Sequence, residues 1–134
     1  MKQKIVLGLR IVAAIILLQT LYFKFTGAPE SKFIFSTLGI EPFGRWFAGI
    51  SELVTCVMLL IPSTAVFGAL MATGIMLGAI ASHLFILGIS VQNDGGLLFS
   101  LACIVLIASL TILILSRNQV KNLFLTGKKF LKLS

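Results

Sequence analysis

Four long apolar blocks dominate this chain and constrain its fold more than any other feature. They span residues 5–25, 45–61, 65–89 and 97–116. Each block is close to the ~20 residues that an α-helix needs to cross the hydrocarbon core of a bilayer. Strands of a membrane barrel would alternate polar and apolar residues, and these blocks do not alternate. The sequence therefore predicts an all-α fold with four transmembrane helices.

The composition argues against a water-soluble domain. Hydrophobic residues make up 58% of the 134 residues and charged residues only 11%, whereas a soluble domain carries about a quarter charged residues. The formal net charge of +7 is concentrated near the two ends of the chain. Because no basic face is interleaved with exposed aromatic residues, nucleic acid is not an expected partner. Membrane lipid with anionic headgroups explains the positive charge better.

Short links between the later blocks predict the topology. Residues 62–64 and 90–96 are so few that consecutive helices must run antiparallel, which gives an up-down four-helix bundle. In the second of these links, Asn93 or Asp94 is expected to cap the fourth helix, with Gly95 and Gly96 forming the turn.

The first connection, residues 27–44, is longer and has a pattern of its own. Pro29 suits the first turn of a helix and Gly39 suits its end, with several apolar residues between them. We therefore expect a short amphipathic helix at the membrane interface. Such a helix would roof the bundle on that side.

The chain divides into a transmembrane domain, residues 1–116, and a basic tail, residues 117–134. On a helix, the basic residues of the tail share one face and its apolar residues share another, which is typical of a helix lying on a membrane surface. The surface candidates are Arg117, Lys121, Lys128 and Lys132. Docking of the tail onto a partner protein is the alternative.

Two ionisable residues lie deep within the apolar blocks. Glu52 is seven residues from Arg45 in the second block, and His83 is six residues before Ile89 in the third. At about 1.5 Å per residue, they lie about 10 Å and 9 Å from the same end of the bundle. Ionisable groups in a membrane helix are costly, so they are candidates for function.

Lys24 of the first block and Ser100 and Cys103 of the fourth lie near the same level. All four predicted helices therefore bring polar atoms to a similar depth, which predicts a polar pocket beneath the first connection. Its candidate residues are Glu52, His83, Lys24, Arg45, Gln19 and Thr55. A carboxylate beside a histidine could shuttle protons to a quinone or hold a small polar ligand. Alternatively these groups are structural: Arg45 or Lys24 neutralises Glu52, and His83 bonds a backbone carbonyl across helices.

The remaining sequence patterns give weaker information about function. Gly74, Gly78 and Ser82 form a stripe of small residues, which serves either packing inside the bundle or a homodimer contact. No cluster offers three or four metal ligands, and a single histidine cannot supply a bis-histidine haem site. We therefore expect no metal and no covalently bound cofactor, and any redox role would need a quinone or a partner subunit.

Several short runs together resemble the DoxX family of small bacterial membrane proteins. They are residues 21–29 (LYFKFTGAP), Gly44-Arg45, residues 49–53 (GISEL) and residues 78–84 (GAIASHL). The resemblance covers the four apolar blocks and excludes the tail. It implies a four-helix membrane fold in the bacterial inner membrane. Some members of the family are subunits of a thiosulfate:quinone oxidoreductase, and others associate with thiol-redox or detoxifying partners.

Three functions remain open at this level. The first is a quinone- or redox-linked accessory subunit with an intramembrane pocket that contains Glu52 and His83. The second is a small transporter or binding protein that holds a polar metabolite in the same pocket. The third is a membrane scaffold or assembly factor that binds no ligand.

The distribution of lysine and arginine predicts the orientation, and a reporter can test it. Eight of these residues lie near the chain ends and three lie near the opposite side of the bundle, so both termini should be cytoplasmic. We expect alkaline phosphatase, which is active only outside the cytoplasm, to be inactive when fused after Ser134. An active phosphatase fusion would contradict this orientation.

Overall fold

A computed structural model describes residues 2–90, 95–122 and 125, and within these ranges the chain is helical with no strand. The helices are α1 (Lys2–Thr26), α2 (Pro29–Thr37), α3 (Phe43–Leu60), α4 (Ala65–Ser82) and α5 (Leu97–Leu115). A 3₁₀ turn, η1 (Pro62–Thr64), joins α3 to α4, and a π-helical turn, η2 (His83–Leu87), extends α4. The predicted all-α four-helix bundle is confirmed.

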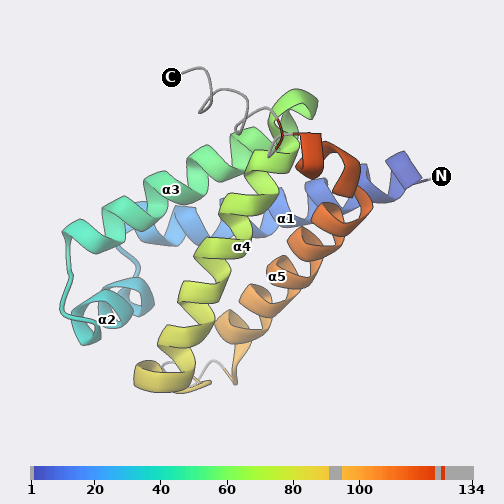
Figure 1. Cartoon of the computed structure of the whole chain (residues 1–134). Coiled ribbons are helices and arrows are strands. Elements are labelled where there is room, and N and C mark those ends of the chain that lie inside the picture. The colour runs from blue at the N-terminus through green and yellow to red at the C-terminus, as the bar shows by residue number, and fades with distance from the viewer. Residues whose placement is uncertain (1, 91–94, 123–124, 126–134) are drawn as a thin grey trace.

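The four long helices form a ring in which each is antiparallel to its neighbours. α1 packs against α3 and α5, and α4 packs against the same two helices from the other side. In Figure 1 the start of α1, the turn η1 and the end of α5 lie at one end of the bundle, while α2 and η2 lie at the other. This is the up-down topology that the short links predict.

The outward surface of the ring is apolar. All four long helices are long and apolar enough to cross a membrane, and large side chains such as Phe47, Phe85 and Ile107 are exposed on them. A continuous apolar exterior of this kind is unsuited to water and suited to lipid. The chain has the build of a multi-pass membrane protein.

Small residues bring the helices together at the centre. Ala13, Ala69, Ala72 and Ala108 are among the most deeply buried residues of the core. In lipid there is little hydrophobic force between helices, so close packing of small side chains has to hold them together. The first turn of α4 approaches the backbone of α3 closely, because a Cβ on Gly68 would lie 2.8 Å from the backbone nitrogen of Leu59.

Helix α2 forms where the sequence predicts it. Pro29 begins the helix, and Gly39 follows its end with a φ of 78° that favours glycine. Ser31 and Phe35, one turn apart, are its buried residues. α2 contacts α1, α3 and η2, so it covers the end of the bundle opposite the start of α1 and the end of α5 (Figure 1).

Some predicted features lie outside the described residues, including Asn93, Asp94, Lys128 and Lys132. Gly95 and Gly96 have positive φ values of 67° and 84°, as a turn before α5 requires. The helix is interrupted at Ser116, and residues 117–122 are again helical. Arg117 and Lys121 on this stretch are both exposed.

A buried arginine holds the end of the bundle where α1 begins and α5 ends. Arg10 of α1 donates from Nε to the carbonyl oxygen of Leu59 at 2.6 Å and from Nη2 to that of Leu60 at 3.0 Å. These carbonyls end α3, where helical N–H partners run out and the helix dipole favours a cation. Arg10 therefore caps α3 and ties it to α1.

We expect Arg10→Met to lower the free energy of unfolding by about 2 kcal/mol, because two carbonyls lose a charged donor. Thermal unfolding of the detergent-solubilised protein measures the change. Lys4→Met, at an exposed lysine of the same helix, is the matched control and should shift stability by less than about 0.5 kcal/mol. Equal midpoints for the two variants would show that Arg10 is not a cap.

Candidate functional site

A cavity of about 330 Å³ lies inside the bundle beneath α2. All four long helices and α2 contribute to it, and most of the residues around it are apolar, among them Ile16, Phe35, Met76 and Val105. Its polar lining residues are Thr20, Lys24, Glu30, Ser31, Glu52, Ser82 and His83. A cavity thus lies beneath α2, where the sequence predicts a polar pocket, and Glu52, His83 and Lys24 are part of its wall, but most of that wall is apolar.

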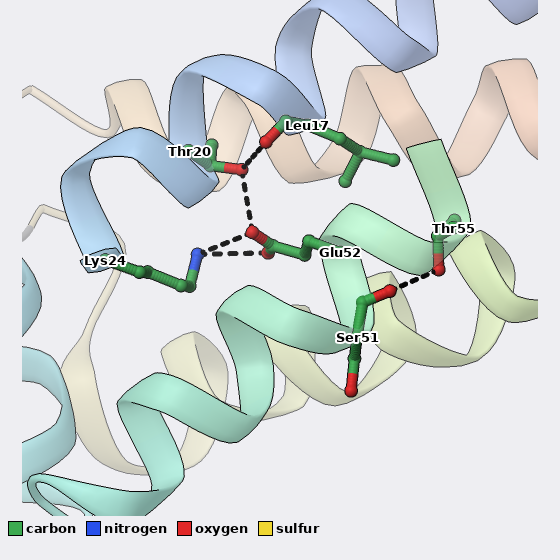
Figure 2. Close-up of polar contacts among 6 residues, drawn as sticks. All are labelled: Leu17, Thr20, Lys24, Ser51, Glu52 and Thr55. Carbon is green, nitrogen blue, oxygen red and sulfur yellow. Dashed lines mark hydrogen bonds and ion pairs between the residues drawn. The ribbon is translucent and has the colours of Figure 1, made fainter. Parts of the chain in front are cut away.

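Glu52 is held by two residues of α1. Lys24 Nζ lies 3.0 Å from Oε1 and 3.1 Å from Oε2 of Glu52, and Thr20 Oγ1 lies 3.1 Å from Oε2 (Figure 2). Thr20 and Lys24 are one helical turn apart, so both side chains reach the same carboxylate across the α1–α3 contact. With only 3% of Glu52 exposed, this ion pair neutralises a charge that the site could not otherwise bury.

Arg45 has a different partner. Its Nε donates to Glu41 Oε1 at 2.8 Å, and its Nη1 donates to the carbonyl oxygen of Lys24. Arg45 is buried but does not line the cavity. Of the two cations that the sequence offered as counter-ions for Glu52, the structure selects Lys24, while Arg45 joins the start of α3 to the last turn of α1.

His83 lies where α4 changes to the π turn. Its Nδ1 is 2.8 Å from the carbonyl oxygen of Ala79, one turn earlier in its own helix and not across helices as the structural alternative supposed. The N–H of Gly88 bonds to the His83 carbonyl at 2.7 Å, closing the π turn. The imidazole ring packs near Phe99 of α5, with 5.8 Å between the ring centroids.

The second nitrogen of His83 is unsatisfied. Nε2 is buried and has no hydrogen-bond partner in the part of the chain that the structure describes. The side chain is 5% exposed and its residue lines the cavity. A buried polar atom without a partner is uncommon and requires an explanation, such as a ligand that completes its bonding.

Glu52 and His83 do not form the predicted carboxylate–histidine pair. The hydrogen bonds of Glu52 go to Lys24 and Thr20, and that of His83 goes to Ala79. The two side chains share one cavity without bonding to each other. A proton relay through direct Glu52–His83 contact is therefore not what the geometry presents.

Two further candidates lie away from the cavity. Gln19 is exposed on the outer surface of α1, because one residue along a helix turns the side chain by about 100° from Thr20. Thr55 is fully buried and donates to the carbonyl oxygen of Ser51 at 2.8 Å. It lies about one turn past Glu52 along α3 and is not among the residues around the cavity.

Four polar residues of the cavity are absent from the predicted set: Thr20, Glu30, Ser31 and Ser82. Thr20 could have been found from its stripe with Lys24 along α1. The helical spacing of Ser31 and Phe35 indicates a shared inward face on α2, which gives a weaker signal. Glu30 and Ser82 could be assigned only once the packing of α2 and α4 around the cavity was known.

The charges around the cavity favour a neutral ligand over an anion. Its ionisable lining residues are Lys24, Glu30, Glu52 and His83, so one ammonium stands against two carboxylates. An anionic ligand would meet net negative charge there, which disfavours binding. No group of three or more His, Cys, Asp or Glu residues that could hold a metal ion occurs among the described residues.

Comparison of the chain with known protein families, with characterised proteins and with solved structures gives no match. The site must therefore be interpreted from its own geometry. The fold agrees with the four-helix architecture that the DoxX resemblance implies, but a four-helix architecture alone does not establish a family.

The Lys24–Glu52 pair makes a stability prediction. We expect Glu52→Leu to lower the free energy of unfolding by about 3 kcal/mol, because it leaves the Lys24 ammonium without its carboxylate. The double variant Lys24→Met/Glu52→Leu removes both charges and should recover most of this loss. Thermal unfolding in detergent measures both variants.

The matched control for this pair is Glu30→Gln. Glu30 is an exposed carboxylate in the first turn of α2, so its neutralisation should change stability by less than about 0.5 kcal/mol. If the double variant is as unstable as Glu52→Leu, the ion pair is not the source of the loss.

Proposed function

We propose that this protein is a DoxX-like membrane protein that binds a quinone in the cavity beneath α2 and serves as an accessory subunit of a redox system. The observation that carries the proposal is the unpartnered Nε2 of His83, a buried polar atom on a residue of an otherwise mostly apolar cavity. An amphipathic ring with polar oxygens is the class of ligand that such a site accommodates.

The size and lining of the cavity support this class of ligand. Its volume of about 330 Å³ is at the lower end of the range of small-molecule sites, about 300–1,000 Å³. Leucine, isoleucine and phenylalanine residues from α1, α2 and α5 line it, and they suit a ring and the start of an isoprenoid tail. A small polar metabolite would leave these apolar walls without contacts, which disfavours the transporter hypothesis.

The placement of the polar groups also suits a quinone. Lys24 and Thr20 are on α1 and His83 follows α4, and these two helices are diagonal in the ring because each packs mainly on α3 and α5. A benzoquinone and its quinol both carry oxygens at opposite positions of the ring, and a hydroxyl of the quinol can donate to a ring nitrogen of histidine. Either form could therefore meet a polar group from each of two facing helices.

The proposed setting is the bacterial inner membrane with both termini in the cytoplasm. The exposed basic residues Lys2, Lys4, Arg117 and Lys121 flank the end of the bundle where the chain begins and α5 ends, in keeping with the positive-inside rule. The cavity then lies in the outer half of the bilayer. Electrons would come from a partner subunit.

The scaffold hypothesis keeps one supporting observation. The Lys24–Glu52 ion pair joins α1 to α3, and a protein without any ligand would use it in the same way. For this reason Glu52 is an ambiguous position for a functional test, since its replacement affects stability as well as the cavity. Substitution of an apolar residue in the cavity wall separates the effect on ligand binding from the effect on stability.

Co-purification tests the proposal. We expect mass spectrometry of organic extracts to find about one quinone per protein after purification in mild detergent. Ala79 lines the cavity and Ala81, on the same helix, does not. Ala79→Phe should fill the cavity and reduce the bound quinone at least tenfold, whereas Ala81→Phe should retain it.

Thermal unfolding shows whether both variants are folded. If wild-type protein carries only bulk lipid, the proposed quinone site is wrong. Retention of quinone by a folded Ala79→Phe variant would show that the quinone binds elsewhere on the protein.

A further inference from the structure

The tautomer of His83 is determined by its bond to Ala79. A carbonyl oxygen can only accept a hydrogen bond, so the Nδ1 that lies 2.8 Å from the Ala79 oxygen must carry the hydrogen. In a neutral imidazole the other nitrogen then has a lone pair and no hydrogen. Nε2, the atom of this residue without a partner among the described residues, can therefore accept a hydrogen bond from a donor on a ligand.

No carboxylate forms an ion pair with His83 among the described residues. Glu52 is the buried carboxylate of the cavity, and its hydrogen bonds go to Lys24 and Thr20. The aromatic neighbour of the imidazole is Phe99. No side chain of the described residues therefore competes with a ligand for Nε2.

Lys24, which lines the cavity from α1, does not discriminate between ligands in the same way. Lys24 has three N–H donors, and its ammonium group makes two hydrogen bonds to Glu52. A remaining donor can bond to a ligand oxygen whether that oxygen belongs to a carbonyl or to a hydroxyl. The oxygens of Glu52 already accept from Lys24 and Thr20. Among the described residues that line the cavity, only His83 has a buried side-chain atom without a hydrogen-bond partner, so discrimination between the two states of a quinone is assigned to its Nε2.

We infer that the cavity binds the hydroquinol in preference to the quinone, because His83 Nε2 accepts a hydrogen bond from a hydroxyl group of the ligand. This inference rests on the proposed function and names the ligand state that the site prefers. The quinone has only acceptor oxygens, so it would leave Nε2 buried and unsatisfied. A hydroxyl of the hydroquinol donates to Nε2 and satisfies it. Because a buried acceptor without a hydrogen bond costs free energy, we expect the quinone to bind about tenfold more weakly than the hydroquinol.

Binding of three matched probes tests the inference. They are a short-chain alkyl benzoquinol, its quinone and the dimethyl ether of the quinol, each titrated anaerobically at pH 8 into the full chain in lipid nanodiscs. We expect the quinol to bind wild-type protein about tenfold more tightly than the quinone or the ether. The midpoint potential of the bound two-electron couple should then be raised by about 30 mV, because tenfold in affinity corresponds to 29.6 mV.

Variants assign the preference to one atom. His83→Phe keeps a ring of similar shape without the acceptor, and it should bind the three probes within about twofold of one another. If His83→Phe does not fold, His83→Gln serves, because its amide can donate as well as accept and should bind quinol and quinone equally. Met76→Leu, an apolar exchange at another lining residue, should keep the tenfold preference.

The outcomes distinguish this inference from the proposed function. If wild-type protein binds the quinone as tightly as the quinol, or if His83→Phe keeps the preference, the inference is overturned while a quinone site remains. If none of the three probes binds, the proposed function itself is overturned and the inference with it.

Discussion

Hydrocarbon offers no hydrogen-bonding partner, so the polar groups of four membrane-spanning helices have to be satisfied within the chain. Arg10 meets this requirement by capping the end of α3, and the Lys24–Glu52 pair meets it between α1 and α3. On the far side of the ring, Thr73 Oγ1 donates to Ser109 Oγ at 3.1 Å and links α4 to α5. Each of these contacts fixes one helix against its neighbour, so the same constraint that makes polar residues expensive also makes them useful as interhelical links.

Against this background two buried side-chain atoms of the described residues have no hydrogen-bond partner, Glu41 Oε2 and His83 Nε2, and of these two residues only His83 lines the cavity. The cavity beside it exists because small residues, Ala48, Gly78, Ala79 and Ala102, form part of its wall while α2 covers its open end. Large apolar side chains at these positions would have filled the space and made a more tightly packed bundle. A bundle selected for stability alone has no evident need for either the space or the unsatisfied acceptor.

The π turn and the covering helix determine how the site is built. The π turn begins at His83 and ends before Gly88, whose φ of 82° breaks the helix. Isolated π turns in membrane and soluble helices are often associated with functional residues. α2, a short α-helix, closes the same end by burying Ser31 and Phe35, so the polar groups of the cavity lie beneath α2 and beside the π turn.

The sequence by itself determined the four spanning helices, their up-down order and the short helix between Pro29 and Gly39. These follow from hydrophobic periodicity, loop length and the conformations of proline and glycine, which are local properties. Only the tertiary structure decided that Lys24 rather than Arg45 neutralises Glu52, that Gln19 and Thr55 lie away from the cavity, and that His83 bonds to its own helix. Helical spacing specifies which face a residue occupies, but the partner opposite that face depends on how the helices cross, and this is set by the packing of the whole bundle.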